Sequence, residues 1–314
     1  MGNCYSTANL EYEQDSSPRS SVSRSSSKKR SSIESFKTER RCSQAHPSIW
    51  LSDSTNLEED VGRIQLQHRL LRNAWNADFI APVKEKLQSG IRVLDIGSGM
   101  GVWVCERAAE FPKSKFTAID VLTEVTAKPL PPNARFTQNT LQKKLRLDDK
   151  MFDYVYVHFL TGYFTKKAWE DLVFKEVVRV TDSGGWIEFV ETSLMLDRAG
   201  PITRKLLDAT FAWANSRGLH MSLYSQLSRL LESHPHIKEF KRDTRSLPIG
   251  NWGGEPGDLA LKAYLPLFRI TKRQNMEFMS TSNDEYDAML EKLPNEFNEY
   301  RTTFTTYRYI ARKS

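Results

Sequence analysis

The spacing of hydrophobic and polar residues changes several times along this 314-residue chain. From about residue 57, apolar side chains recur every three or four positions, which predicts an amphipathic helix that ends near Trp75. From residue 91 onward, short apolar runs alternate with stretches of helical spacing. The predicted strands cover residues 91–96, 116–120, 134–138, 152–158 and 186–191, and the predicted helices between them cover residues 102–111 and 166–180.

Alternating strands and helices are typical of a mostly parallel sheet with helices on both faces, so we predict an α/β fold. After residue 201 the pattern is helical, with two further strands predicted near residues 239–247 and 304–312. We divide the chain into a tail and one domain that has three regions. The tail covers residues 1–47 and the domain covers residues 48–314. Within the domain, the three regions are N-terminal helices at 48–90, a cofactor-binding core at 91–192 and a substrate-side region at 193–314.

The tail differs from the rest of the chain in composition. It is rich in Ser, Arg and Lys and poor in large apolar residues, so we expect residues 1–47 to be disordered. Between Ser17 and Arg41, eight Lys/Arg and two Glu give 8 − 2 = +6, which equals the formal charge of the whole chain. The remaining chain is therefore close to neutral, and we do not expect a nucleic acid partner.

The first six residues, MGNCYS, match the pattern for myristoylation of Gly2, and Cys4 is a candidate for palmitoylation. With the nearby basic residues, these groups would hold the tail against an anionic membrane surface. No apolar run approaches the roughly 20 residues that a bilayer span requires. We expect a cytoplasmic protein that the tail can hold at the cytoplasmic face of a membrane. The alternative is that the basic cluster directs nuclear import.

The most specific motif is VLDIGSGMG at residues 93–101, where a predicted strand runs into closely spaced glycines and then into a helix. Such turns let a ligand approach the backbone at the carboxyl end of a strand. The spacing is GxGxG, with Val102 next, whereas dinucleotide sites have GxGxxG. Asp95 would repel a diphosphate and favour a cationic ligand. We therefore predict S-adenosyl-L-methionine as the cofactor, with NAD as the alternative.

A second acidic residue, Asp120, ends the next predicted strand, where a carboxylate can accept hydrogen bonds from ribose hydroxyls. Three cysteines lie far apart in the sequence, at Cys4, Cys42 and Cys105, which favours neither a disulfide framework nor a metal site. We predict no metal.

These motifs resemble the class I S-adenosylmethionine-dependent methyltransferases, and in particular a fungal group of methyltransferase-domain proteins. The resemblance covers residues 49–314. It is carried by Trp50-Leu51, Gln67-His68, VLDIGSGMGVW at 93–103, FTAID at 116–120, FDYVYVHFL at 152–160, SGGWIEFVE at 183–191 and LPIGNWGG at 247–254. It implies a Rossmann-like, seven-stranded, mostly parallel sheet in the order 3-2-1-4-5-7-6, with the last strand antiparallel.

The chain departs from that family after the third predicted strand, where an Asp often lies near the adenine amine. Here the sequence is Gln138-Asn139-Thr140, and the Asn139 amide oxygen can still accept a hydrogen bond. The predicted cofactor-binding residues are Asp95, Gly97, Ser98, Gly99, Gly101, Asp120, Val121, Asn139 and Thr140.

Methyl transfer is an in-line displacement, so an enzyme mainly positions the acceptor and excludes water. A base helps when the acceptor is a hydroxyl, and His158, at the end of the fourth strand, is the candidate. Candidate substrate contacts are His68, Tyr163, Glu191 and Trp252. A packing role is the alternative for each, and for Trp252 the alternative is a simple loop anchor.

The sequence therefore predicts methyl transfer from S-adenosylmethionine to a small-molecule or lipid acceptor. The alternative function is a regulatory or interaction protein that binds the cofactor with little or no catalysis. The sequence indicates no oligomeric state.

Overall fold

The computed structural model describes residues 57–120, 130–139, 141 and 144–314. The predicted tail and the residues Gly2, Cys4, Val121 and Thr140 lie outside the described residues, so the predictions made for them stay predictions.

The centre of the fold is a seven-stranded sheet in the order β3-β2-β1-β4-β5-β7-β6, which confirms the expected topology. Strands β1 to β5 are parallel to one another, and β7 runs antiparallel to both β5 and β6. The strands are β1 (Arg92–Ile96), β2 (Lys115–Asp120), β3 (Ala134–Gln138), β4 (Phe152–His158), β5 (Thr181–Thr192), β6 (Ile237–Pro248) and β7 (Thr303–Lys313).

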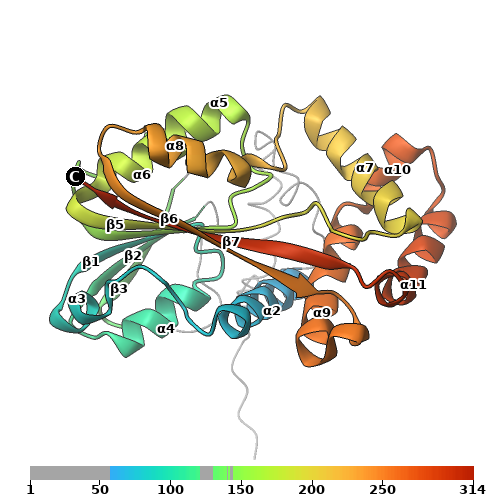
Figure 1. Ribbon diagram of the computed structural model, residues 1–314, viewed down its shortest axis with the longest axis horizontal. Coiled ribbons are helices and arrows are strands. Elements are labelled where there is room, and N and C mark those ends of the chain that lie inside the picture. Colours follow the sequence, from blue (N-terminus) through green and yellow to red (C-terminus); the bar gives the residue numbers. More distant parts are fainter. Residues whose placement is uncertain (1–56, 121–129, 140, 142–143) are drawn as a thin grey trace, which may run out of the picture.

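Helices cover both faces of the sheet, as Figure 1 shows, with α3 and α4 on one face and α5, α6 and α8 on the other. The helices that precede β5 in the chain are α2 (Leu57–Trp75), α3 (Lys84–Ser89), α4 (Val102–Glu110), α5 (Lys166–Ala168), the π-helical η1 (Trp169–Phe174) and α6 (Lys175–Val180). The helices that follow β5 are α7 (Pro201–Ser216), η2 (Leu223–Gln226), α8 (Leu227–Ser233), η3 (Asn251–Gly253), α9 (Gly254–Ile270), α10 (Lys272–Met279) and α11 (Asn283–Glu299). Helices α7, α9, α10 and α11 gather beyond one end of the sheet (Figure 1). None of the helices in the described parts of the chain has the length and apolar composition that a membrane span needs.

The core lies on both faces of the sheet because side chains of a strand alternate between its faces. In β4, Val155 and Val157 belong to the buried cluster that includes η1 and α6. Tyr154 and Tyr156 belong to the cluster on the α4 face, where the Trp103 ring stacks on Tyr156 with 4.1 Å between the ring centroids. Burial on both faces explains why the strands read as continuous apolar runs.

Strand β5 begins earlier than the sequence predicted. Thr181 pairs with Phe152, and the next register pair is Trp186 with Tyr154, so the segment at residues 182–185 is an irregularity within the strand. The residues just ahead of the predicted fifth strand therefore belong to β5 as an irregular segment.

Candidate functional site

The glycine turn after β1 is built for close approach by a ligand. Gly97, Gly99 and Gly101 have φ values of +78°, +54° and +76°, in the left-handed region that favours glycine. A Cβ atom added to Gly97 would lie 2.6 Å from the backbone oxygen of His158, so that position is closed on one side by β4. At Gly99 the nearest atoms would be 3.8 Å away, on Ile64 of α2. The turn is therefore packed at Gly97 and open at Gly99.

A cavity of about 170 Å³ lies against this turn, at the carboxyl ends of β1, β2, β4 and β5. Helix α2 closes it with Ile64 and Gln67, and α9 contributes Tyr264 and Leu267. Nine of the residues predicted from the sequence lie on its wall: Gly97, Ser98, Gly99, Asp120, Asn139, His158, His68, Tyr163 and Glu191. The strand ends therefore bring most of the predicted cofactor residues and candidate substrate residues to one space.

Polar groups on this wall suit a ligand with several hydrogen-bonding groups. The Asp120 carboxylate lies on the cavity wall and accepts a hydrogen bond of 2.8 Å from the Gly99 backbone N–H. The Ser98 hydroxyl is buried and has no hydrogen-bond partner in the described part of the chain. A buried polar group without a partner is costly, so a ligand that bonds it is favoured. The open turn, the carboxylate and this hydroxyl together fit the amino-acid and ribose portions of S-adenosylmethionine.

Two predicted cofactor residues do not lie on the cavity wall. Asp95 is completely buried, and its Oδ1 lies 2.9 Å from His158 Nε2. Its register partner in β4 is Tyr156, so His158, two residues further on, shares its face of the sheet. The prediction that Asp95 faces a cationic ligand directly is wrong, because His158 lies between the carboxylate and the cavity. Gly101 is also buried behind the wall, as the N-cap of α4.

Trp252 lies away from the cavity in the structure. Its indole N–H donates a 2.9 Å hydrogen bond to the backbone oxygen of Ile249, and the Arg198 guanidinium lies 5.4 Å from the centre of its ring. The prediction of a substrate contact is wrong, because these interactions hold the indole in its own loop. The alternative of a loop anchor describes the side chain correctly.

Several wall residues were not predicted. Arg63 and Ile64 come from α2, whereas Tyr264 and Leu267 come from α9. The apolar stripes of both helices were visible in the sequence, but a stripe does not reveal which cavity it covers. Gln67 was noticed only as part of the family resemblance.

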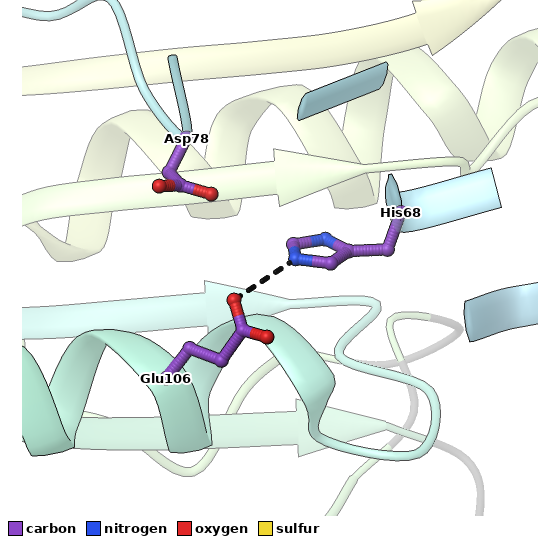
Figure 2. A group of neighbouring side chains, drawn as sticks. All are labelled: His68, Asp78 and Glu106. Atoms are coloured by element: carbon purple, nitrogen blue, oxygen red, sulfur yellow. Dashed lines mark hydrogen bonds and ion pairs between the residues drawn. The ribbon is translucent and has the colours of Figure 1, made fainter. Parts of the chain in front are cut away.

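His68 also belongs to an ion-pair cluster between α2 and α4 (Figure 2). Its Nε2 lies 3.3 Å from Glu106, and the ligand atoms of His68, Asp78 and Glu106 all lie within 4.8 Å of one another. Arg107 contacts Asp78 at 2.6 Å, and Arg72 contacts Glu106 at 3.1 Å. Because these two guanidinium groups already balance the carboxylates, a metal ion would have to displace them. Burial lowers the pKa of His68, so this side chain is neutral at pH 7. We interpret the cluster as a link that holds α2 over the cavity.

Glu191 is a buried carboxyl group on the cavity wall. Its oxygens accept a 2.8 Å hydrogen bond from the Leu160 backbone N–H and a 3.4 Å bond from that of Thr161. Burial raises its pKa to about 7 against the opposing effect of these hydrogen bonds. Near neutral pH the site therefore holds a carboxyl group that is partly protonated.

Replacing Glu191 by glutamine is expected to stabilise the protein at pH 8 more than at pH 5. The pKa of Glu191 is about 7 in the folded protein, above the ordinary value of 4.5 that applies in the unfolded chain. The free energy of unfolding of the parent therefore falls as the pH rises from 4.5 to 7. At about 1.36 kcal/mol for each pKa unit, the free energy of unfolding of Glu191→Gln should exceed that of the parent by on the order of 3 kcal/mol above pH 7. Urea unfolding at both pH values measures the difference. An equal gain at the two pH values would contradict it, and Glu232→Gln at an exposed position of α8 is the control.

Comparison with known families agrees with the geometry of the site. Residues 93–185, which span β1, the glycine turn and the following strands up to β5, match the family model of a methyltransferase domain. With the sheet order and the open turn, this match identifies a class I methyltransferase that uses S-adenosylmethionine, and not the NAD enzyme considered as an alternative.

The similar proteins are fungal. The chain is 22% identical over 79% of its length to "Methyltransferase pytC" of Aspergillus terreus, of which 74% is aligned. It is 28% identical over 70% of its length to "Methyltransferase str2" of Strobilurus tenacellus, of which 81% is aligned. It is also 22% identical over 63% of its length to "Secondary metabolism regulator LAE1" of Cochliobolus heterostrophus, of which 66% is aligned.

Proposed function

We propose that the protein methylates a hydroxyl group of a small-molecule or lipid acceptor. The observation that carries the proposal is the pair formed by His158 and Asp95, 2.9 Å apart at the end of β4. The His158 ring lies on the wall of the cavity that the glycine turn also lines, and the buried Asp95 lies behind it. A histidine oriented by a carboxylate is an arrangement that removes a proton from a hydroxyl nucleophile.

When bound, the cofactor would supply a methyl group that is bonded to its positively charged sulfonium sulfur and is thereby activated for transfer. The chain's own residues hold and orient the reactants. In this proposal the open turn at Gly99 would admit the cofactor beside the backbone. The Asp120 carboxylate on the cavity wall would accept hydrogen bonds from ribose hydroxyls, and Asn139, on the same wall, would contact the adenine. When His158 Nε2 donates its proton to Asp95, Nδ1 is the atom that accepts the proton of the acceptor hydroxyl.

Much of the cavity wall is apolar, which supports a small organic acceptor. Leu160, Phe164 and Leu194 line the cavity together with Tyr264 and Leu267. Such side chains exclude water, and this strengthens the interaction between His158 and a hydroxyl group. A small apolar molecule with one hydroxyl fits this surface better than a highly charged one does.

The proposal is tested by incubating the purified protein with methyl-labelled S-adenosylmethionine and a cell extract. We expect the label in organic-extractable molecules of low mass, as base-stable methyl ethers that mass spectrometry identifies. Label that stays with protein or nucleic acid, or that base releases as methanol from an ester, would contradict the proposal.

Similarity to a protein described as a secondary metabolism regulator supports a second candidate, a regulator that binds the cofactor with little or no catalysis. The same experiment separates the two functions. Calorimetric binding of S-adenosylmethionine without transfer of label to any fraction favours the regulator.

A further inference from the structure

A second, smaller cavity of about 20 Å³ lies beside the first, between α7 and α9. Its wall consists of Leu194, Leu196, Leu207, Thr210, Tyr264, Leu267, Phe268 and Thr271. Every one of these side chains is apolar, aromatic or a threonine, and no charged group is among them. This composition suits an apolar group of a ligand better than a charged one.

The two threonine hydroxyls do not make this cavity polar. The Thr210 hydroxyl bonds the backbone oxygen of Leu206 at 2.9 Å, and the Thr271 hydroxyl bonds that of Leu267 at 3.1 Å. Each hydroxyl is thus held by the backbone of its own chain segment. The remaining polar atom of the wall is the Tyr264 hydroxyl, which is buried and has no hydrogen-bond partner in the described part of the chain. A buried water needs two to four polar partners, and this wall offers one, so the cavity binds apolar groups in preference to water.

The small cavity and the large one share part of their wall. Leu194, Tyr264 and Leu267 line both cavities. Tyr264 is buried, and its ring centre lies 4.6 Å from that of Phe304, which holds it at the boundary. A molecule whose hydroxyl lies near His158 in the large cavity can therefore extend past Tyr264 toward Leu207 and Thr210.

We propose that the acceptor carries an alkyl substituent that occupies this small cavity, so that the substrate class is alkyl-substituted phenols or alcohols. The inference rests on the proposed hydroxyl methylation, and it adds the part of the acceptor that gives selectivity. The reacting oxygen lies by the pair of His158 and Asp95. The alkyl group lies between α7 and α9, where Leu207 lines the small cavity and not the large one.

The test measures binding and does not depend on turnover. A series of 4-alkylphenols from methyl to hexyl is titrated by calorimetry into the full-length protein saturated with S-adenosylhomocysteine. Each added methylene should tighten binding about threefold to fourfold until the small cavity is full, after which the gain should stop. No binding by any member, or affinity that does not depend on chain length, would overturn the inference.

Variants at Leu207 test whether the dependence of binding affinity on chain length comes from the small cavity. Leu207→Phe fills the cavity and should abolish the dependence on chain length while 4-methylphenol binds within twofold of the parent. Leu207→Ala enlarges the cavity and should move the plateau to longer chains. Leu290→Phe is the matched control, since Leu207 and Leu290 are both 9% exposed in the same hydrophobic cluster and Leu290 lines neither cavity. A plateau that both Leu207 variants leave unchanged would also overturn the inference.

The proposed function can fail separately. If alkylphenols bind with the expected dependence on length and the labelled methyl group is never transferred to them, the apolar subsite stands and hydroxyl methylation does not. If methyl ethers form equally well on phenols of every chain length and the affinities are equal too, hydroxyl methylation stands and the subsite does not.

Discussion

Replacing Gly99 by arginine should weaken the binding of S-adenosylmethionine by at least about 100-fold, or roughly 2.8 kcal/mol, and leave the fold intact. A Cβ atom at this position would lie 3.8 Å from Ile64, so the backbone of the turn does not have to move. The long side chain must then extend into the cavity that Gly99 lines, where it takes the space of the cofactor and brings a second cation beside a sulfonium. Calorimetric titration with S-adenosylmethionine measures the loss.

Gly184→Arg is a matched control for this variant. Gly184 has a φ of +74°, and a Cβ atom there would meet nothing within 4 Å. Both variants therefore bear the same cost of about 1–2 kcal/mol for a side chain in the left-handed region, and only Gly99 lines the cavity. Normal cofactor affinity in Gly99→Arg, or an equal loss in Gly184→Arg, would show that the cofactor does not bind against this turn.

The sheet could be predicted from the sequence because its signals are local. The strand predicted at residues 152–158 has the observed bounds of β4, and the one at 134–138 has those of β3. Each is a short β-prone run between turns, so neither required knowledge of its neighbours. The order of the strands came from the family resemblance, since local patterns permit several orders.

The position of Asp95 could not be predicted in the same way. Its distance from the first glycine suggested a carboxylate facing the ligand, and the sequence carries no sign that His158 lies between them. That arrangement depends on the register of β1 against β4, which pairs Asp95 with Tyr156 across a long separation in sequence. A one-residue shift in register would have placed these side chains on opposite faces of the sheet.

The prediction for Trp252 was wrong for a related reason. The sequence gives this residue as a candidate substrate contact within a Gly-rich segment. The structure anchors its indole to the Ile249 backbone, and α2 closes the cavity with Ile64 and His68. Helix α2 precedes the glycine turn in sequence, and its position over that turn depends on contacts such as those of His68 and Glu106, which no local pattern encodes.

The second large effect is expected at His158. If this residue accepts the proton of the acceptor hydroxyl, His158→Gln should lower kcat by about 10²–10⁴-fold, the range for removal of a general base. The affinity for S-adenosylmethionine should stay within about threefold, because the cavity keeps a side chain of similar size. The value of kcat is measured from the methyl ether formed in reactions that are quenched at fixed times. The control is His236→Gln, which changes an exposed histidine.

Asp95→Asn tests the partner of that base. An asparagine can donate its amide N–H to His158 Nε2, and this would place the imidazole proton on Nδ1, the atom that has to accept the proton from the substrate. We therefore expect a fall in kcat that approaches that of His158→Gln, with little change in KM. If the pair were only a packing element, Asp95→Asn would change stability and leave kcat near that of the parent.

The acidity of the acceptor separates proton removal from a general loss of geometry. A phenol that is already ionised at neutral pH needs no base, so on such an acceptor His158→Gln should recover most of the activity it loses on an ordinary alkylphenol. An equal loss on both acceptors would show that His158 positions the substrate and does not remove its proton. An acidic phenol also carries the electron-withdrawing substituent that lowers its pKa, so the quantity to compare is the ratio of the variant rate to the parent rate on each acceptor. In that ratio the intrinsic reactivity of each phenol cancels, and the need for proton removal by the pair of His158 and Asp95 remains.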